Sequence, residues 1–429
     1  MKIAICVLAG LVFLPCTFAA ADKLQTRFEE LQKEYKSQET AYFTARDAVP
    51  ADALDRLVQL RKMDHLFPSN SMVDQFLAFE ADCRGTKLGL SALHHLVSAY
   101  SMTGIPDSQS GKGFSAALTH LSENYAEHND LDLIVRWCDR SEHPAVTGFL
   151  DKMTQSPHRH VQAAAHLNLA RIYSSRATVA ATLKASLSVI GDEADLQDYK
   201  GALQSSYSKF EKFDTEESRR MAVASLRKLL TDYPEELEPP RTLYGPIIME
   251  VERSDIDALT KQPRRAMKTL ASSIQYELDH LSIGSTAPDI VGPDADGQSM
   301  CLNEFKGNVV VLMFSFKGCG PCEAMYPENR ELITELHDRD FRFIGVMGDQ
   351  SVDTVHEAVK EGNITWPVWW DGGNRGPIAT QWNVAGWPTV YVLDRDLKIR
   401  FIGPRGKTLR KAVISLLDEP QASKASISK

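Results

Sequence analysis

The most informative feature of the chain is the tetrapeptide Cys319-Gly320-Pro321-Cys322, which closely follows the apolar run 309–314. A run of this kind is typical of a buried parallel strand. Residues 322–337 carry apolar side chains at helical spacing and predict a helix directly after the strand. The expected inner face of this helix consists of Ala324, Leu332, Ile333 and Leu336. The sequence therefore predicts a strand that delivers two cysteines to the start of a helix.

Two cysteines three positions apart at a helix start favour redox chemistry. Their sulfurs can close a small disulfide ring, and the helix dipole with its free backbone N–H groups favours the first sulfur as thiolate. Pro321 suits the first turn, since its missing N–H costs nothing there and its fixed φ fits a helix. We therefore interpret Cys319 and Cys322 as a redox-active pair.

The alternative is that the tetrapeptide forms half of a zinc site, which would require a second Cys or Cys/His pair at ligand spacing. Beyond the first residues, the other cysteines are Cys83, Cys138 and Cys301, and they are widely scattered. We therefore expect no metal. The sequence leaves open whether Cys83 and Cys138 form a structural disulfide, and it predicts a part-buried free thiol at Cys301.

Length and charge set the broad class. The 429 residues, 43% of them hydrophobic, suffice for two or more domains with their own cores. A formal net charge of -9 gives no support to nucleic-acid binding.

Residues 1–21 have the pattern of a signal peptide: Lys2, the apolar stretch 3–18 and three alanines at 19–21. An uncleaved anchor is disfavoured, because the stretch is shorter than the roughly 20 residues of a span and contains Pro15. We expect an exported chain, periplasmic or otherwise outside the cytoplasm.

Residues 22–280 are predicted to form an all-α domain. A heptad-like stripe begins it and predicts a helix that packs onto its own domain: Leu24, Phe28, Leu31, Tyr35, Gln38 and Tyr42. Further helices are expected at 52–63, 88–101, 113–127, 146–153, 161–173, 178–188, 216–233 and 264–281. No motif with a chemical mechanism occurs in this half. Binding or positioning of a partner is therefore its expected role.

Strand-like runs alternate with helical ones from residue 283 to about 420, which predicts an α/β domain with a largely parallel sheet. A hairpin is expected at 289–302, turning at 294–297. The other expected elements are strands at 309–316, 341–347, 389–393 and 398–402 and helices at 352–361, 378–382 and 408–417. The polar tail 421–429 is expected to be disordered.

Residues 283–420 resemble the thioredoxin-fold domain of the exported, TlpA/ResA-like thiol-disulfide oxidoreductases. Four segments carry the resemblance: 284–289, 302–307, the Cys319–Cys322 motif and Gly386-Trp387-Pro388-Thr389. The resemblance implies that Cys319 attacks a substrate disulfide and that Cys322 resolves the mixed disulfide. It also implies a cis proline at Pro388 and a substrate strand that pairs with the backbone of Trp387. Gly320 and Pro321 belong to the same substrate-facing loop.

The acid that usually serves the resolving thiol is missing from its expected positions. Met313 stands in the central strand and Met325 stands three residues after Cys322. Glu323 is the nearest acid and is a candidate for proton transfer. Lys317 either lowers the pKa of Cys319 through its charge or is an ordinary solvated lysine.

The sequence thus predicts an enzyme that exchanges disulfides with protein substrates through Cys319 and Cys322. It would be a reductant supplied by a membrane electron donor and would need no cofactor beyond its own disulfide. A peroxiredoxin is a weaker alternative, because Phe316 and Leu312 stand where such enzymes require a Thr or Ser and a Pro. A further alternative is a helical binding scaffold that carries a redox-sensitive docking module.

Overall fold

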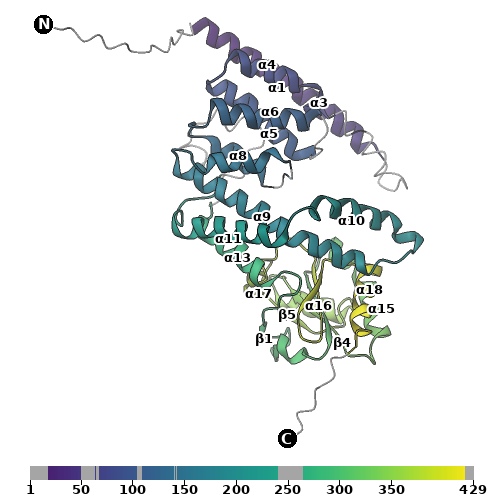
Figure 1. Cartoon of the computed structure of the whole chain (residues 1–429). Helices are drawn as coiled ribbons and strands as arrows, with labels where there is room; N and C mark the ends of the chain where they lie inside the picture. The colour runs from purple at the N-terminus through teal and green to yellow at the C-terminus, as the bar shows by residue number, and fades with distance from the viewer. Residues whose placement is uncertain are drawn as a thin grey trace, which may run out of the picture. The chain divides into compact units, whose positions relative to one another are not determined.

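The computed structural model describes residues 18–49, 63, 67–103, 109–139, 141, 143–239 and 264–420 (Figure 1). Most of the candidate signal segment, the helix expected at 52–63 and the tail 421–429 lie outside the described residues. Among the described residues, no helix combines the length and the apolar character that a membrane span needs. A helical amino-terminal region and a carboxyl-terminal domain with a central sheet confirm the predicted fold class.

The chain divides into two compact units, Met1–Asn168 with Glu236–Arg265 and Leu169–Glu235 with Ala266–Lys429. The sequence changes near residue 280 from helical patterns to alternating strand and helix patterns. The division into units does not follow this change, because α9 (Arg159–Ser188) begins in the first unit and ends in the second. Ala185 and Val189 pack against the core of the carboxyl-terminal sheet. The domain boundaries inferred from the sequence, 22–280 and 283–420, therefore remain a prediction about independent folding.

The first unit is built from helices. They are α1 (Phe18–Asp47), α3 (Pro68–Ser71), α4 (Val73–Asp82), α5 (Lys87–Thr103), α6 (Gln109–Asn124), α7 (Leu131–Val135), the 3₁₀ turn η2 (Arg136–Cys138) and α8 (Ala145–Met153). The stripe on α1 faces the unit's own core, as expected: Phe28 stacks on Phe79 with ring centroids 5.3 Å apart, and Tyr35 meets Phe76 edge-on. Cys83 and Cys138 are both buried and free, so they do not form a disulfide.

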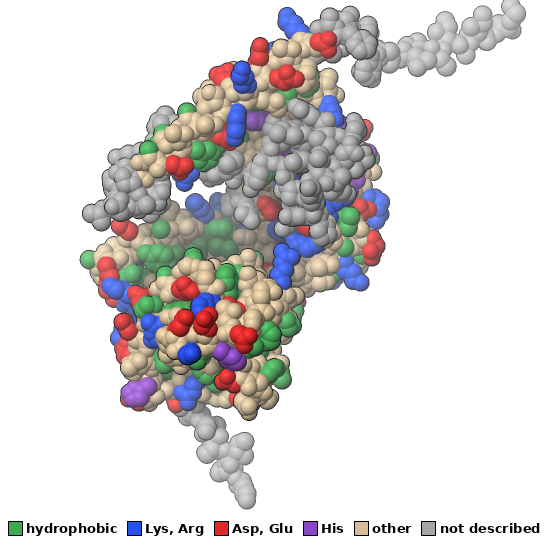
Figure 2. All heavy atoms as spheres, turned by 180° about the vertical axis from the view of Figure 1, so that it is seen from behind, with side chains coloured by type: hydrophobic (Ala, Val, Ile, Leu, Met, Phe, Trp, Pro, Cys, Tyr) green, Lys and Arg blue, Asp and Glu red, His purple; other side chains and the backbone are tan. Residues whose placement is uncertain are grey.

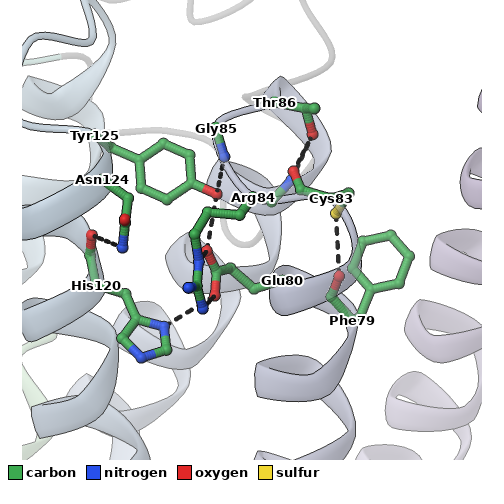
Figure 3. Close-up of polar contacts among 10 residues, drawn as sticks. Phe79, Glu80, Cys83, Arg84, Gly85, Thr86, His120, Asn124 and Tyr125 are labelled. Atoms are coloured by element: carbon green, nitrogen blue, oxygen red, sulfur yellow. Dashed lines mark hydrogen bonds and ion pairs between the residues drawn. The ribbon is translucent and has the colours of Figure 1, made fainter. Parts of the chain in front are cut away.

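A buried carboxylate joins α4 to α6 in this unit (Figure 3). Glu80 is fully buried, and Arg84 donates to it at 3.0 and 3.1 Å. Tyr125 donates its hydroxyl to the same carboxylate at 3.1 Å, and His120 Nδ1 lies 2.9 Å away. Burial alone would raise the pKa of Glu80, but the hydrogen bonds from these partners outweigh burial and hold the pKa below its usual value. The cluster is a fully paired structural network.

The second unit begins with helices that pack on the sheet domain or beside it. They are the remainder of α9, η3 (Ala194–Leu196), α10 (Gln197–Phe210), α11 (Thr215–Thr231) and α13 (Met267–His280). The two helices expected at 161–173 and 178–188 are one continuous helix, α9, and α10 was not predicted. Ser273 and Glu277 of α13 hold Asn383: the Ser273 hydroxyl donates to its Oδ1 at 2.8 Å, and its Nδ2 donates to Glu277 at 2.9 Å.

The central sheet has the strand order β5-β4-β3-β6-β7. Its strands are β3 (Val309–Ser315), β4 (Phe341–Met347), β5 (Val368–Trp370), β6 (Thr389–Leu393) and β7 (Ile399–Ile402). The pairs β3–β4 and β4–β5 are parallel, whereas β3–β6 and β6–β7 are antiparallel. The expectation of a largely parallel sheet was therefore wrong. A turn as short as the one after β6 can join only antiparallel strands.

The remaining elements cover the sheet. They are β1 (Val291–Pro293) and β2 (Ser299–Cys301), which form the predicted hairpin, η5 (Leu302–Phe305), α14 (Gly320–Glu323), α15 (Tyr326–Glu335), α16 (Val352–Lys360), α17 (Pro377–Gln381) and α18 (Gly406–Leu417). Cys301 is half-buried and free, as predicted. Alternate residues of β3 face two cores, one with α15, α16 and α18 and one with Trp369 and Trp382. All seven residues of β3 are buried.

The helix expected at 322–337 is interrupted between α14 and α15. Pro327 stands in the first turn of α15, where it has no N–H to donate to the carbonyl of Glu323. The break turns Met325 and Tyr326 towards the core and leaves Ala324 exposed. The prediction that Ala324 lies on the inner face was therefore wrong, while Leu332 and Leu336 are buried there as expected.

Charges on the surface of the carboxyl-terminal unit are mixed. In Figure 2, acidic and basic side chains lie interspersed on the visible face of this unit. A continuous basic surface, as nucleic-acid binding requires, is not seen on that face.

Replacement of Glu80 by Ala should lower the free energy of unfolding of the first unit by about 2–3 kcal/mol, since it leaves the buried Tyr125 hydroxyl and the half-buried Arg84 and His120 without their shared acceptor. Because the folded pKa of Glu80 lies below the unfolded value, this stability is present at neutral pH and is lost as the pH falls through the folded pKa. Urea denaturation followed by circular dichroism at several pH values measures both effects. The exposed Glu123, which also acts on Arg84, is the matched control, and Glu123→Ala should change stability by less than about 0.5 kcal/mol. Equal losses for the two variants would contradict a structural role for the buried network.

Candidate active site

A disulfide joins Cys319 to Cys322 just beyond the carboxyl end of β3, with Cα atoms 5.2 Å apart. Cys319 is the N-cap residue of α14, and its carbonyl accepts the N–H groups of Cys322 and Glu323, both at 2.9 Å. Gly320 and Pro321 form the exposed first turn. Cys319 keeps 6% of its surface exposed, whereas Cys322 is fully buried. Of the two sulfur-bearing residues, Cys319 is therefore the one within reach of a partner.

The loop before the disulfide depends on glycine. Gly318 has φ of +85°, a conformation that side chains with a Cβ rarely adopt. Its N–H donates to Glu323 Oε1 at 2.7 Å. Glu323 therefore binds the loop that precedes Cys319, and this contact is where the structure places the candidate acid.

The ammonium of Lys317 is paired with two carboxylates and not with a sulfur. Its Nζ lies 2.8 Å from Glu357 of α16 and 3.2 Å from Glu361 at the end of that helix. The hydrogen bond to Glu357 raises the pKa of Lys317 most strongly. The charge of Lys317 is thus shared with α16, which leaves less of it to act on Cys319.

Asp349 is a residue of the site that the sequence analysis missed. It follows β4 by one residue, is 6% exposed, and accepts the backbone N–H of Lys317 at 3.1 Å. Burial raises the pKa of this carboxyl, and the Lys317 N–H opposes the rise. A signal was present in the sequence, since ligand- and substrate-facing side chains gather at the carboxyl ends of parallel strands.

At the two positions where the resemblance would place an acid, this chain has methionines, and their surroundings in the structure are also apolar. Met313 and Met325 are both buried in the core cluster that contains Cys319 and Cys322. Neither methionine can exchange a proton.

Trp387 and Pro388 lie beside the ends of β3 and β4. The peptide bond between them is cis. The Trp387 ring meets Phe316 edge-on at 5.6 Å, and it passes so close to Gly348 that a Cβ there would lie 2.7 Å from Trp387 Cη2. Arg405 donates to the carbonyl of Pro388 at 3.3 Å. Glycine at 348 therefore leaves room for the indole.

Metal ligands do not gather at this site. Across the described ranges, no group of three or more His, Cys, Asp or Glu side chains is arranged to hold a metal ion.

Comparison with known proteins found a family and several relatives that resemble the carboxyl-terminal domain. The AhpC/TSA family matches residues 283–402. Thiol-disulfide oxidoreductase ResA of Bacillus thuringiensis subsp. konkukian is 31% identical over 121 residues, which are 28% of this chain and 69% of that protein. ResA of Geobacillus kaustophilus is 26% identical over 157 residues, which are 34% of this chain and 89% of that protein.

One solved structure is similar to part of the chain. The thioredoxin domain of a thiol-disulfide oxidoreductase from Bacteroides vulgatus is 28% identical and covers 32% of this chain and 99% of its own, with a TM-score of 0.30. Together with a disulfide at the end of the central strand, the sequence matches identify the domain. The chain belongs to the AhpC/TSA family through residues 283–402, and its carboxyl-terminal domain is a ResA-like thiol-disulfide oxidoreductase.

Proposed function

We propose that the protein exchanges disulfides with protein substrates through Cys319 and Cys322, and that it acts as a reductant. The observation that carries this proposal is the closed disulfide with one partly exposed residue, Cys319, and one buried residue, Cys322. The less buried cysteine is the easier one for a substrate disulfide to approach, and its buried neighbour can then displace the substrate. This difference in exposure supports the proposed attacking role of Cys319 and resolving role of Cys322.

The proposed reaction starts from the reduced pair. The Cys319 thiolate attacks one sulfur of a substrate disulfide, and the other substrate sulfur leaves and takes up a proton. The thiolate of Cys322 then attacks Cys319 Sγ and releases the second substrate sulfur, which is also protonated. Two electrons and two protons have passed to the substrate, and the enzyme is left with its own disulfide. A dithiol donor at the membrane would restore the reduced pair by the same exchange in reverse.

A substrate segment would lie against the loop that contains Trp387. An extended chain can pair with the backbone before Pro388, as in strand addition. Pro388 has no N–H, so its own backbone offers no donor to the neighbouring sulfurs. Gly320 and Pro321 would form the opposite side of the contact.

The two halves of the chain are proposed to have separate tasks. Residues 22–280 would bind or position a partner, and residues 283–420 would carry out the exchange. Should the helical region be the working part, with the sulfur pair serving only for docking, a double Cys319→Ser, Cys322→Ser variant would retain partner binding and biological function.

Single serine variants test the roles of the two cysteines. Cys322→Ser should accumulate mixed disulfides with substrate, because the resolving sulfur is gone, and Cys319→Ser should form none. Both should reduce insulin no faster than the uncatalysed reaction. Non-reducing electrophoresis and the insulin turbidity assay are the measurements. Trapping by Cys319→Ser instead of Cys322→Ser would reverse the assignment, and rapid consumption of hydrogen peroxide by the wild type would favour a peroxidase.

The equilibrium potential tests the direction of electron flow. Thiol titration against glutathione, in a variant with Cys83, Cys138 and Cys301 replaced by Ser, should give a value near the roughly −270 mV of thioredoxin. A value near about −120 mV would instead mark a disulfide-donating oxidant.

Export is proposed from residues 1–21. The chain isolated from outside the cytoplasm should have the mass of a protein that begins near residue 22. An intact mass, or recovery from the cytoplasm alone, would contradict export by a cleaved signal.

A further inference from the structure

Two consecutive backbone amides in front of Cys319 each donate to a carboxylate. The N–H of Lys317 donates to Asp349 Oδ1 at 3.1 Å and lies 3.4 Å from its Oδ2. The next N–H, that of Gly318, donates to Glu323 at 2.7 Å. Hydrogen bonds to charged acceptors are stronger than neutral ones. The loop that presents Cys319 is therefore held by two acids, one from the end of β4 and one from α14.

The charges around Asp349 can be named. Lys317 and Glu323 are the charged groups that act on it, and the Lys317 ammonium is itself bound to Glu357 and Glu361. The positive charge closest in sequence to Cys319 is thus engaged by carboxylates.

Tyr326 lies in the buried surroundings of the disulfide, and the charges of both acids act on it. Its side chain is 3% exposed and belongs to the core cluster that contains Cys319 and Cys322. Burial chiefly raises its pKa, and the charges of Glu323 and Asp349 raise it further. Ser315 also acts on this phenol, but its hydroxyl donates to Met347 Sδ at 3.2 Å. In hydrogen-bond geometry the Tyr326 hydroxyl has no partner among the described residues.

We propose that Asp349 is the buried acid of this site and a positioning residue for the exchange reaction: it holds the loop before Cys319 and opposes negative charge on that sulfur. It would replace, from the end of β4, the acid that Met313 and Met325 do not provide. The inference rests on the proposed role of Cys319 as the attacking sulfur.

We expect the charge of Asp349 to favour the disulfide over the reduced pair of thiols. A carboxylate near Cys319 disfavours the thiolate and so raises the pKa of that thiol. The reduced pair then gains less from ionisation, the disulfide is favoured, and the protein becomes a stronger reductant. Burial raises the pKa of Asp349, so the effect is lost, as the pH falls, at a higher pH than for an exposed aspartate.

The variant Asp349→Asn tests the inference, since the amide oxygen can still accept the Lys317 N–H while the charge is gone. The pKa of Cys319 should fall, as measured by alkylation rate against pH in the reduced protein. The equilibrium constant for reduction by glutathione should rise about tenfold, which corresponds to about 30 mV for this two-electron couple. The plot of alkylation rate against pH should also lose the inflection that the titration of Asp349 produces at acidic pH.

Asp371 provides a matched control. It follows β5 directly, is 4% exposed, and has a pKa that burial raises in the same way. Its carboxylate accepts the N–H groups of Ile378 and Ala379 in α17 and not those of the Cys319 loop. Asp371→Asn should therefore leave the pKa of Cys319 and the glutathione equilibrium unchanged, whatever it does to stability.

The remaining outcomes distinguish a failure of the role inferred for Asp349 from a failure of the proposed function. If Asp349→Asn matches Asp371→Asn in pKa and equilibrium constant, the inference is overturned. If Asp349→Asn does not fold, Asp349→Ser removes the same charge, keeps an oxygen that can accept the Lys317 N–H, and should lower the pKa of Cys319. An unchanged pKa in that variant would then overturn the inference. Failure of Cys322→Ser to trap a substrate would overturn the proposed function instead, and it is scored independently of both acid variants.

Discussion

The burial of β3 is the constraint on which the active site depends. All seven residues of this strand are buried, and its backbone is paired to β4 on one side and β6 on the other. Two cores cover its two faces. A strand held in this way cannot shift by one residue without exchanging the side chains of the two cores. The position of the disulfide, a few residues beyond the end of β3, is therefore fixed by the packing of the whole domain.

Hydrogen bonds to backbone N–H groups, as well as ion pairs between side chains, determine where the charged groups of the site lie. Glu323 and Asp349 accept the amides of the loop, and the ammonium of Lys317 turns to α16. An unpaired lysine at this place would favour a thiolate at Cys319, whereas a paired lysine with acids nearby disfavours it. The site thus combines an exposed first turn with acidic surroundings. This combination supports the proposed role of the pair as a reductant.

The helices that precede the sheet in the second unit are not a loose extension of it. Lys407 and Lys411 of α18 form ion pairs with Asp195 and Glu193, which lie between α9 and α10. Ala185 and Val189 add apolar contacts to the same core, and α13 holds Asn383 beyond α17. Exposed ion pairs contribute little free energy, so the apolar contacts are the stronger term. The sheet domain is therefore packed against helices that lie outside residues 283–402, the part of the chain that the family matches.

Patterns within short stretches of the sequence were sufficient to predict much of the fold. The apolar run at 309–314, the hairpin turn at 294–297 and the Cys319–Cys322 motif each predicted the element found there, because strand burial, turn chemistry and helix starts depend on neighbouring residues. The same local pattern failed at Pro327, whose effect on the helix 322–337 was overlooked.

The sequence by itself determined the strands β3, β4, β6 and β7, the helices α16 and α18, the pair of cysteines and the absence of an acid at Met313 and Met325. Only the tertiary structure decided that β6 and β7 run antiparallel to their neighbours, that α9 reaches into the second unit, and that Lys317 pairs with α16. It also brought Asp349 to the loop of Cys319. The physical reason is distance along the chain. Asp349 and Lys317 are 32 residues apart in sequence, and their contact exists only because the parallel pairing of β3 and β4 brings the ends of the two strands together.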